Sequence, residues 1–343
     1  MKRFVLVVAT LVVAACGAND PAGSTTPSTS SPVTAPVTSI PGSSVTPSTA
    51  GPDTTAPAWE GPPGTITRTW VEDGRLLAEV VDSAGATSLV TSTDGILWSE
   101  ATTPPPVDAA GPVVFFGEEV LRFTTVTSER CTASTSLEAS PDGEAWVSVD
   151  PGPLDRGTVM AATANDEVLV VAWMESHSAD EEACDDPRPI TVFVSKDGRT
   201  FTPSTESAAT FDLGHLGSID DVIWTGTLFM MAGSDLSATT FWYAFDGQSW
   251  TRHDAPLPDH VYGVDLLLWD DTVLAVGSMA DSGALAGWRS DGNRWKPLTL
   301  PNLAWSSNLA AWEGGLAIMD MSGEPAFHLS TDAGTWTRVV GTG

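Results

Sequence analysis

Short apolar runs and tight polar turns alternate along this 343-residue chain from Thr65 to its end. "LLLWDDTVLAVGS" (266–278) and "LAAWEGGLAIMDM" (309–321) each contain an apolar run, a turn rich in Asp and Gly, and a second apolar run. Turns of this composition supply the positive φ that tight β-hairpins require. The pattern therefore predicts antiparallel hairpins in an all-β fold. In four hairpins a tryptophan comes just before the turn: Trp70, Trp224, Trp269 and Trp312.

A second turn, which we call the D-G turn, recurs six times, and its spacing predicts the architecture. The intervals between its Asp residues are 48, 55, 49, 45 and 41. A period in the forties is typical of a β-propeller with one four-stranded blade per repeat. We therefore predict that residues 59–343 form a six-bladed β-propeller of four-stranded antiparallel blades. The copies are "STDGILW" (92–98), "SPDGEAW" (140–146), "SKDGRTF" (195–201), "AFDGQSW" (244–250), "RSDGNRW" (289–295) and "STDAGTW" (330–336).

The positions of these turns also predict how the ring closes. The last copy ends at Trp336, seven residues before the chain stops, so the last strand of blade six is C-terminal. Blade one has room for four strands of its own. We therefore expect closure by packing between the first and last blades, without a strand exchanged between the two ends of the domain.

The D-G turns resemble the Asp box, Ser-x-Asp-x-Gly-x-x-Trp, of sialidase-like propellers. The resemblance implies that Asp94 caps its turn by accepting backbone N–H groups, that Gly95 supplies a positive φ and that Trp98 packs between blades. Every copy here is one residue shorter than the family's box, and Ser is replaced in two copies, so only this structural role is carried over. The same roles fall on Asp142, Gly143, Trp146, Asp197, Gly198, Phe201, Asp246, Gly247, Trp250, Asp291, Gly292, Trp295, Asp332, Gly334 and Trp336.

The first 15 residues have the features of a secretory signal. Lys2 and Arg3 precede an apolar run of 12 residues, which is shorter than the roughly 20 that a membrane-spanning helix needs. "VAAC" (13–16) resembles the bacterial lipobox, which implies cleavage before Cys16 and a diacylglyceryl group on its thiol. We predict a lipoprotein signal at 1–15 and an extracytoplasmic chain anchored in the cell membrane by lipid. An ordinary signal peptide is the alternative.

Residues 16–58 have the composition of a tether. From 17 to 58 the chain has 17 Ser or Thr and 8 Pro, and it lacks Lys, Arg and aromatic residues. Such a segment buries too little apolar area to offset the entropy of ordering, so we predict that it is disordered.

The charge of the chain limits its partners. The formal net charge is −29, and no basic stripe interrupts it, so we expect no nucleic-acid partner. Solubility of an exposed surface is the simplest reason for the acidity. We expect a monomer.

Two cysteines remain once Cys16 carries lipid. Cys131 and Cys184 fall at the same place in successive repeats, between the second and third strands of blades two and three. Outside the cytoplasm such a pair predicts a disulfide. The second of these insertions is acidic and includes His177, Asp180 and Asp185. Calcium binding there is an open alternative, but charged loops are usually only solvated, so no cofactor and no metal ligand are assigned.

Candidate ligand residues come from the connections between blades, which meet the central channel in propellers. "DHVYG" (259–263) places a His and a Tyr beside an Asp, a combination suited to acid–base or nucleophilic work. The simpler interpretation is that both side chains bond locally at the start of a strand. A tryptophan in such a connection can stack on a sugar ring or serve in packing. The candidates are Arg156, His215, Asp220, Asp259, His260, Tyr262 and Trp305.

Sialidases use three Arg, a Tyr–Glu pair and an acidic Asp, and they carry an Arg-Ile-Pro sequence. This chain has two Tyr and lacks Arg-Ile-Pro, and it also lacks a Gly-x-Ser-x-Gly motif and a phosphate loop, so no catalytic residue is assigned. We predict a binding module for a protein, a glycan or a cell-wall ligand. A diverged carbohydrate-active enzyme with its site on the channel face is the alternative, and an assembly or scaffold role is a further one.

Overall fold

The computed structural model of the chain describes fourteen segments: 59–72, 74–101, 111–127, 132–143, 145–176, 188–206, 211–213, 217–235, 238–254, 257–258, 260–290, 294–303, 308–320 and 324–342. These segments contain strands and one short 3₁₀ helix, η1 (Gly152–Arg156). The strands are β1 (Thr65–Glu72), β2 (Arg75–Val81), β3 (Thr87–Ser92), β4 (Ser99–Glu100), β5 (Val113–Phe116), β6 (Glu119–Thr127), β7 (Ala133–Ser140), β8 (Val147–Val149), β9 (Gly157–Ala164), β10 (Leu169–Glu175), β11 (Ile190–Ser195), β12 (Thr202–Pro203), β13 (Ser218–Trp224), β14 (Phe229–Ser234), β15 (Thr239–Ala244), β16 (Thr251–Asp254), β17 (Val261–Trp269), β18 (Thr272–Met279), β19 (Leu285–Ser290), β20 (Trp295–Leu298), β21 (Asn308–Trp312), β22 (Gly315–Asp320), β23 (Ala326–Ser330) and β24 (Thr337–Val339).

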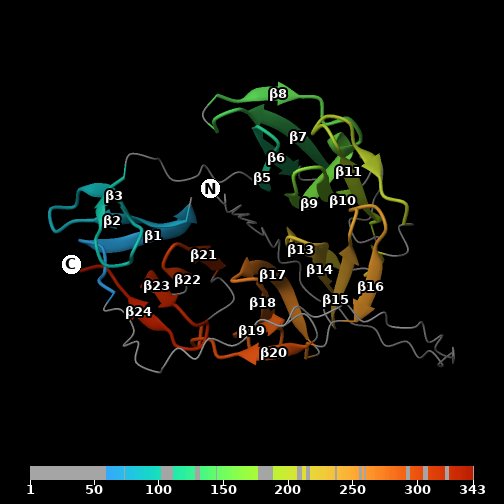
Figure 1. The fold of residues 1–343 in the computed structure, drawn as a ribbon. Helices are drawn as coiled ribbons and strands as arrows, with labels where there is room; N and C mark the ends of the chain where they lie inside the picture. The colour runs from blue at the N-terminus through green and yellow to red at the C-terminus, as the bar shows by residue number, and fades with distance from the viewer. Residues whose placement is uncertain are drawn as a thin grey trace. The chain divides into compact units, whose positions relative to one another are not determined.

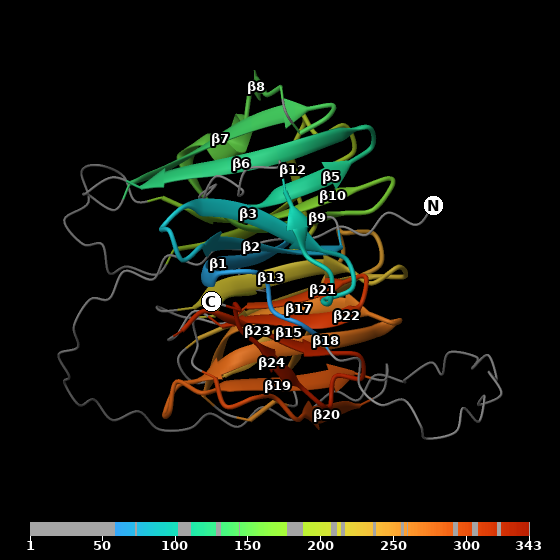
Figure 2. The same ribbon diagram turned by 90° about the vertical axis from the view of Figure 1, so that its left-hand side faces the viewer.

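Every four consecutive strands form one antiparallel sheet, and there are six such sheets. The sheets follow one another around a ring, with the first strand of each sheet innermost (Figure 1). Seen from the side, the inner strands run along the axis of the ring (Figure 2). The prediction of a six-bladed β-propeller with four-stranded blades is therefore confirmed. We call the sheets blades 1 to 6 in chain order.

The strand order gives the propeller two different ends. The first strand of each blade begins at one end, which we call the loop face, and the loops between second and third strands lie there too. The D-G turns, which join third and fourth strands, lie at the opposite end with the hairpins between first and second strands. We call this end the turn face. None of the described segments forms a helix that is long and apolar enough to cross a bilayer.

The core of the propeller lies between blades rather than at its centre. Alternate residues of each strand point to the two faces of the sheet, so a blade contributes side chains to both of its neighbours. Hydrophobic clusters of buried residues join blades 2 and 3, 3 and 4, 4 and 5, 5 and 6, and 6 and 1. All of these clusters and all six sheets lie within residues 59–342, so this segment carries its own hydrophobic core.

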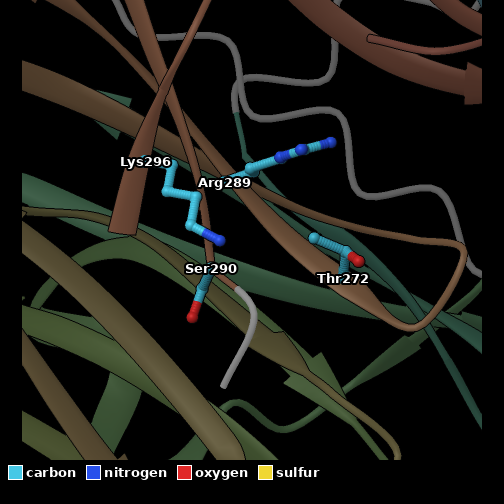
Figure 3. A pocket seen from close by; sticks show the side chains of 4 residues that line it. All are labelled: Thr272, Arg289, Ser290 and Lys296. Atoms are coloured by element: carbon cyan, nitrogen blue, oxygen red, sulfur yellow. The ribbon is translucent and has the colours of Figure 1, made fainter. Parts of the chain in front are cut away.

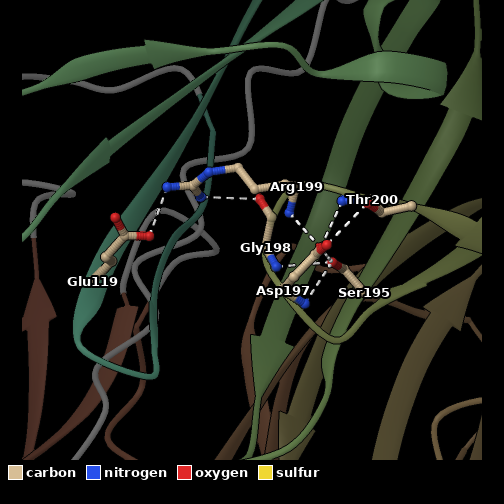
Figure 4. A network of polar contacts seen from close by, with 6 residues as sticks. All are labelled: Glu119, Ser195, Asp197, Gly198, Arg199 and Thr200. Carbon is tan, nitrogen blue, oxygen red and sulfur yellow. Dashed lines mark hydrogen bonds and ion pairs between the residues drawn. The ribbon is translucent and has the colours of Figure 1, made fainter.

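In the five D-G turns whose aspartate is described, the aspartate accepts main-chain N–H groups of the turn. In blade 3 the Asp197 Oδ1 atom accepts the N–H groups of Arg199 and Thr200 at 2.8 and 2.7 Å (Figure 4). The Ser195 hydroxyl donates to Asp197 Oδ1 at 3.0 Å and accepts the N–H of Gly198. These backbone donors, Thr200 first, hold the pKa of Asp197 far below its usual range. The turn is then tied to blade 2 by an ion pair of 2.7 Å between Arg199 and Glu119.

The turn of blade 6 departs from the sequence-based assignment. A glycine with φ between +66° and +77° follows the aspartate in the turns of blades 1 to 4. In blade 6 this place is taken by Ala333, with φ +57°, and Gly334 is not in the left-handed region. Gly334 instead donates its N–H to Asp332 Oδ1 at 2.8 Å. The sequence-based assignment of the positive φ to Gly334 is therefore wrong by one residue, because Ala333 adopts it.

Blades 1 and 6 close the ring without exchanging a strand. Pro63 and Thr342 form an isolated parallel bridge, in which Gly64 N–H donates to Thr342 O at 2.9 Å and Thr342 N–H donates to Pro62 O at 2.8 Å. Glu313 N–H donates to Gly74 O at 2.7 Å on the turn face. Closure therefore combines the hydrophobic cluster with main-chain hydrogen bonds between the two ends of the propeller.

Candidate functional site

Four of the seven predicted ligand residues lie within the described residues. Arg156 ends η1 and is exposed, Asp220 is a buried residue of β13, His260 is exposed just before β17, and Tyr262 is a half-buried residue of β17. Each lies at or near the start of a first strand, so all four belong to the loop-face half of blades 3, 4 and 5. The other three predicted ligand residues, His215, Asp259 and Trp305, lie outside the described residues. So do the lipidation and disulfide cysteines, the turn residues Asp291 and Gly292, and the acids of the second insertion: the cysteines are Cys16, Cys131 and Cys184.

Arg156 lies at the base of the two longest loops. Ser176, the last described residue before the loop of blade 3, donates its N–H to Arg156 O at 3.0 Å. Its hydroxyl accepts the N–H of Ala133, just after the loop of blade 2, at 2.6 Å. The Thr135 hydroxyl donates to Gly157 O at 2.7 Å. The bases of both loops and the backbone of Arg156 are thus fixed to one another on the loop face.

Asp220 connects blade 4 to blade 5. It is 6% exposed and accepts hydrogen bonds from the Ser234 hydroxyl at 2.6 Å and the Ser218 hydroxyl at 3.0 Å. It also accepts the N–H of Val264, which belongs to β17 of the next blade, at 3.1 Å. Burial raises the pKa of Asp220 to about 6, and these hydrogen bonds limit the rise.

Asp221 makes a second connection of the same kind. It is 5% exposed and accepts the N–H of Leu266 in blade 5 at 2.8 Å. Burial, and then the charge of Asp265, raise the pKa of Asp221 well above its usual range. Asp265 itself is half-buried in β17, where burial and the charge of Asp220 raise its pKa to about 7. Burial therefore raises the pKa of all three carboxyl groups, and a neighbouring carboxylate adds to the rise for Asp221 and Asp265.

Two irregularities of the strands position these carboxyl groups. The pairing of β13 with β14 shifts register between Ile219 and Asp221, and that of β17 with β18 shifts between Tyr262 and Asp265. An extra residue at such a β-bulge turns side chains away from the regular alternation. The bulges explain how adjacent residues of one strand, Asp220 and Asp221, both reach main-chain donors of the next blade.

His260 and Tyr262 do not join this carboxyl group through hydrogen bonds of the described residues. His260 has φ +68°, an uncommon value for a residue with a side chain, and its carbonyl accepts the N–H of Ala280 at 2.8 Å. The nearest link is made by Gly263, whose N–H donates to the Ser234 hydroxyl at 3.2 Å. The structure thus separates an exposed His260 from the buried carboxyl group.

Asp221 and Asp265 were missed by sequence reasoning, although a signal was present. Both interrupt otherwise apolar strands, "SIDDVIW" (218–224) and "VYGVDLLLW" (261–269). A charged residue in a strand that is buried on both faces needs a partner, because an unpaired buried charge is costly. Connections between blades are the usual place of ligand residues in propellers, whereas these two acids lie inside strands.

Two hollows on the described part of the surface lie apart from the predicted ligand residues. One, of about 110 Å³, is lined by Thr272, Arg289, Ser290 and Lys296 in blade 5 (Figure 3). Lys296 points toward Ser290, whereas Arg289 points away from it. Another, of about 200 Å³, lies over the outer strands of blade 3. Both lie beside D-G turns, and none of the predicted ligand residues lines either of them.

The described residues do not form a metal site. Within the fourteen described segments, no three His, Cys, Asp or Glu side chains are grouped so that they could hold an ion. The acidic insertion for which calcium was an alternative lies outside those segments.

Comparison with known proteins gives no family. No protein-family model matches the sequence, and no curated protein matches it. Solved structures with some similarity include the sialidase of Trypanosoma rangeli with the inhibitor DANA, with 11% identity, a TM-score of 0.49, and 67% of this chain and 48% of that chain covered. The same sialidase with sialic acid has 12% identity and a TM-score of 0.47, with 85% and 54% covered. The GH43B protein of a Bacteroides ovatus xyloglucan locus has 11% identity and a TM-score of 0.40, with 67% and 54% covered. The chain spans about half the length of these proteins.

Proposed function

We propose that this chain is an extracytoplasmic lipoprotein whose propeller is a binding module, with its ligand surface on the loop face. The lipid on Cys16 anchors the chain, residues 16–58 act as a tether, and residues 59–343 form the module. The ligand is a protein, a glycan or a cell-wall polymer.

The observation that carries this proposal is where the chain enters the propeller. Glu60 N–H donates to Gly95 O at 2.9 Å, and Gly95 belongs to the D-G turn of blade 1. The first described residues of the module, Trp59 and Glu60, therefore lie at the turn face. Arg156 and the described bases of the two enlarged loops lie at the opposite end of the propeller. Loops that a rigid scaffold holds in place are the usual carriers of binding residues.

The disulfide between Cys131 and Cys184 belongs to this proposal. Cys131 is two residues from Ala133, and Cys184 is four residues from Arg188. The bases of the two loops are hydrogen-bonded to each other, and an extended residue spans up to about 3.5 Å. The few residues between these bases and the cysteines are therefore long enough to bring the two sulfur atoms together. The bridge would join the two enlarged loops into one surface. Peptide mass spectrometry of the unreduced protein should recover the linked peptides, and two free thiols would contradict the bridge.

The buried aspartates favour binding over catalysis. Asp220 and Asp221 accept main-chain N–H groups of the next blade, so their oxygen atoms are committed to holding blades 4 and 5 together. One observation favours the alternative of a carbohydrate-active enzyme. Asp265 has a pKa of about 7 beside two other carboxyl groups, which is the state that a general acid of a glycoside hydrolase requires.

A binding screen on residues 59–343 tests the binding proposal. The probes are a glycan array, peptidoglycan fragments and a biotinylated extract of cell-surface proteins, each with and without calcium. We expect Arg156→Ala to weaken the interaction at least tenfold and Arg289→Ala, an exposed arginine beside the turn face, to leave it unchanged. Absence of binding to all three probes, or equal loss in both variants, would contradict a loop-face binding module.

Hydrolysis assays distinguish the enzyme. We would measure release of nitrophenol from a panel of nitrophenyl glycosides by the wild type and by Asp265→Asn. Activity that is lost in Asp265→Asn would replace the binding proposal by the enzymatic one. Activity that is unchanged in the variant would exclude Asp265 as the acid.

A further inference from the structure

The face of blade 2 that is turned toward blade 1 differs from the equivalent face of every other blade. At the middle of this face, a residue of the second strand pairs with one of the third strand. In blade 2 this pair is Arg122 with Glu138. In the other blades both members are less than 9% exposed, and only one residue among them is polar: Ala78–Val90, Val171–Phe193, Met231–Trp242, Ala275–Trp288 and Ile318–His328.

The polar pair of blade 2 is satisfied within its own blade. Arg122 Nη2 and Nε donate to Glu138 Oε2 at 2.7 and 3.0 Å, and the side chains remain 22% and 31% exposed. The Arg122 guanidinium also lies 4.1 Å from the centre of the Trp146 ring of the same blade. Phe115 and Val126, on the same face, are 48% and 64% exposed. This face keeps its polar groups paired whether or not blade 1 covers it.

The D-G turn of blade 2 is also uncovered. A Cβ atom added to Gly95, Gly198 or Gly247 would meet side chains of the preceding blade within 3.1 Å. Those side chains belong to blades 6, 2 and 3, which shows that each of these turns rests on its neighbour. A Cβ atom added to Gly143 in blade 2 would meet nothing within 4 Å among the described residues.

Among the described residues, no hydrophobic cluster joins blades 1 and 2, although one joins each of the other five neighbouring pairs. Blade 1 is held instead to blade 6, by a hydrophobic cluster and by the hydrogen bonds of Gly64, Thr342 and Glu313. Blade 2 is held to blade 3 by its own cluster and by the ion pair of Arg199 with Glu119. As far as the described side chains go, the junction between blades 1 and 2 is thus the least apolar of the six; we call it the seam.

We propose that the ring opens at the seam, with blades 1 and 6 moving as one body relative to blades 2 and 3. Separation of any other neighbouring pair would expose buried apolar side chains, at roughly 25 cal/mol for each Å². Separation at the seam leaves the Arg122–Glu138 ion pair intact and exposes a blade 2 face whose centre is already polar. Of the described residues it uncovers few buried apolar side chains, among them Leu77 and Val120. The seam is therefore the place where a bound partner can change the width of the ring at low cost in free energy.

Amide hydrogen exchange of residues 59–343 tests the opening directly. The inner strands β5, β9 and β13 are comparable in sheet pairing, because each pairs only with the second strand of its own blade. Local opening determines how fast such amides exchange. We expect the amides of β5 to exchange at least tenfold faster than those of β9 and β13. Equal protection of β5, β9 and β13 would overturn the proposal.

A variant that makes the seam apolar provides the second test. Arg122→Val with Glu138→Phe copies the Val171–Phe193 pair of blade 3. We expect this variant to slow the exchange of β5 at least tenfold and to leave β13 unchanged. Arg338→Val, which removes an exposed ion pair with Glu324 in blade 6, is the control and should alter neither strand. A folded double variant in which β5 exchanges as in the wild type would contradict the proposal, and a variant that fails to fold would leave the comparison of the wild-type strands to decide it.

Discussion

Charged side chains at two junctions of the propeller, that of blades 4 and 5 and the seam, have opposite effects. Between blades 4 and 5, Asp220 and Asp221 accept N–H groups of the neighbouring blade and are almost fully buried. At the seam, Arg122 and Glu138 bond to each other on one blade and stay partly exposed. A buried carboxylate whose donors lie on the next blade connects two sheets, whereas an ion pair completed within one sheet offers its neighbour nothing. The position of the partner, and not the charge itself, decides whether a junction is closed.

Exchanging the central residue pairs of the blade 2 and blade 3 faces should have the largest effect on the free energy of unfolding. We expect Val171→Arg with Phe193→Glu to lower the free energy of unfolding by at least about 4 kcal/mol, because both side chains are buried between blades 2 and 3. Urea denaturation followed by tryptophan fluorescence measures this loss. The reverse exchange, Arg122→Val with Glu138→Phe, should cost no more than about 1 kcal/mol. Equal losses in the two variants would remove the distinction between the junctions.

Removing the carboxylate of Asp221 should have the next largest effect. Asp221→Ala leaves the N–H groups of Val222 and Leu266 without an acceptor in a buried place, at about 1–3 kcal/mol for each group. Asp82→Ala is the matched control, because Asp82 also accepts two N–H groups but in an exposed turn. Calorimetry should show a much larger fall in Tm for Asp221→Ala. A similar fall in both variants would mean that the connection between blades contributes little.

Two glycine substitutions compare a covered turn with an uncovered one. Gly95→Ala brings its new Cβ within 2.6 Å of Trp59 and 3.0 Å of Trp312, in addition to the strain of a positive φ. We expect it to cost about 2–4 kcal/mol. Gly143→Ala meets nothing within 4 Å among the described residues and should cost only the backbone term, about 1–2 kcal/mol. Denaturation curves that give the same loss would show that blade 2's turn is covered after all.

The carboxyl group of Asp265 should make stability depend on pH. The pKa values of Asp220 and Asp265 are raised from 3.8 to about 6 and about 7, so the folded state holds these protons more tightly than the unfolded state. The free energy of unfolding should therefore fall as the pH rises from about 4 to about 7 and level off above. The turn residues Asp94 and Asp332, whose pKa values are lowered, act in the opposite sense below about pH 4.

The variant Asp265→Asn separates this effect from the general charge of the chain. We expect it to raise Tm by a few degrees at pH 8 and to leave Tm unchanged at pH 4.5, where the carboxyl is protonated. A thermal shift assay over this range measures both values. Parallel pH profiles for the variant and the wild type would attribute the dependence to the net charge of −29 instead.

The smallest effect is expected at the left-handed alanine of blade 6. Ala333→Gly relieves the strain of φ +57° but increases the freedom of the unfolded chain, so a gain of up to about 1 kcal/mol is expected. Gly334→Ala is the control, since Gly334 does not have a positive φ, and it should change stability little. A loss in Ala333→Gly would show that the methyl group's burial outweighs the strain.

The fold was predictable because the same sequence pattern occurs six times along the chain. Repetition of the D-G turn and of the hairpin pattern fixes the number of blades, and alternation along the strands fixes which residues are buried. The seam was not predicted, because hydrophobic patterning was read within each repeat. Comparison between repeats would have shown it: Arg122 and Glu138 stand where the other blades carry mostly apolar residues.

The site was predicted less completely than the fold. Asp220 was selected, but Asp221 and Asp265 were not, because their positions depend on two β-bulges that move single residues out of alternation. The acids themselves stand out in apolar strands, but a bulge displaces one residue locally, and the polar and apolar pattern does not show where that displacement occurs. The acid expected beside His260 and Tyr262 is Asp259, which lies outside the described residues, so this grouping stays a prediction.

The bridge between Pro63 and Thr342 has a consequence for the order of the chain itself. It places Thr342 beside Pro63, four residues after Trp59, so a short peptide could link residue 343 to residue 59 without disturbing a blade. New ends could then be opened between blades 1 and 2, in the connection at 102–110. Such a circular permutant would keep all six sheets and all five hydrophobic clusters uncut, and its ends would coincide with the seam. The six blades could thus be encoded with chain ends between blades 6 and 1, as in this sequence, or between blades 1 and 2.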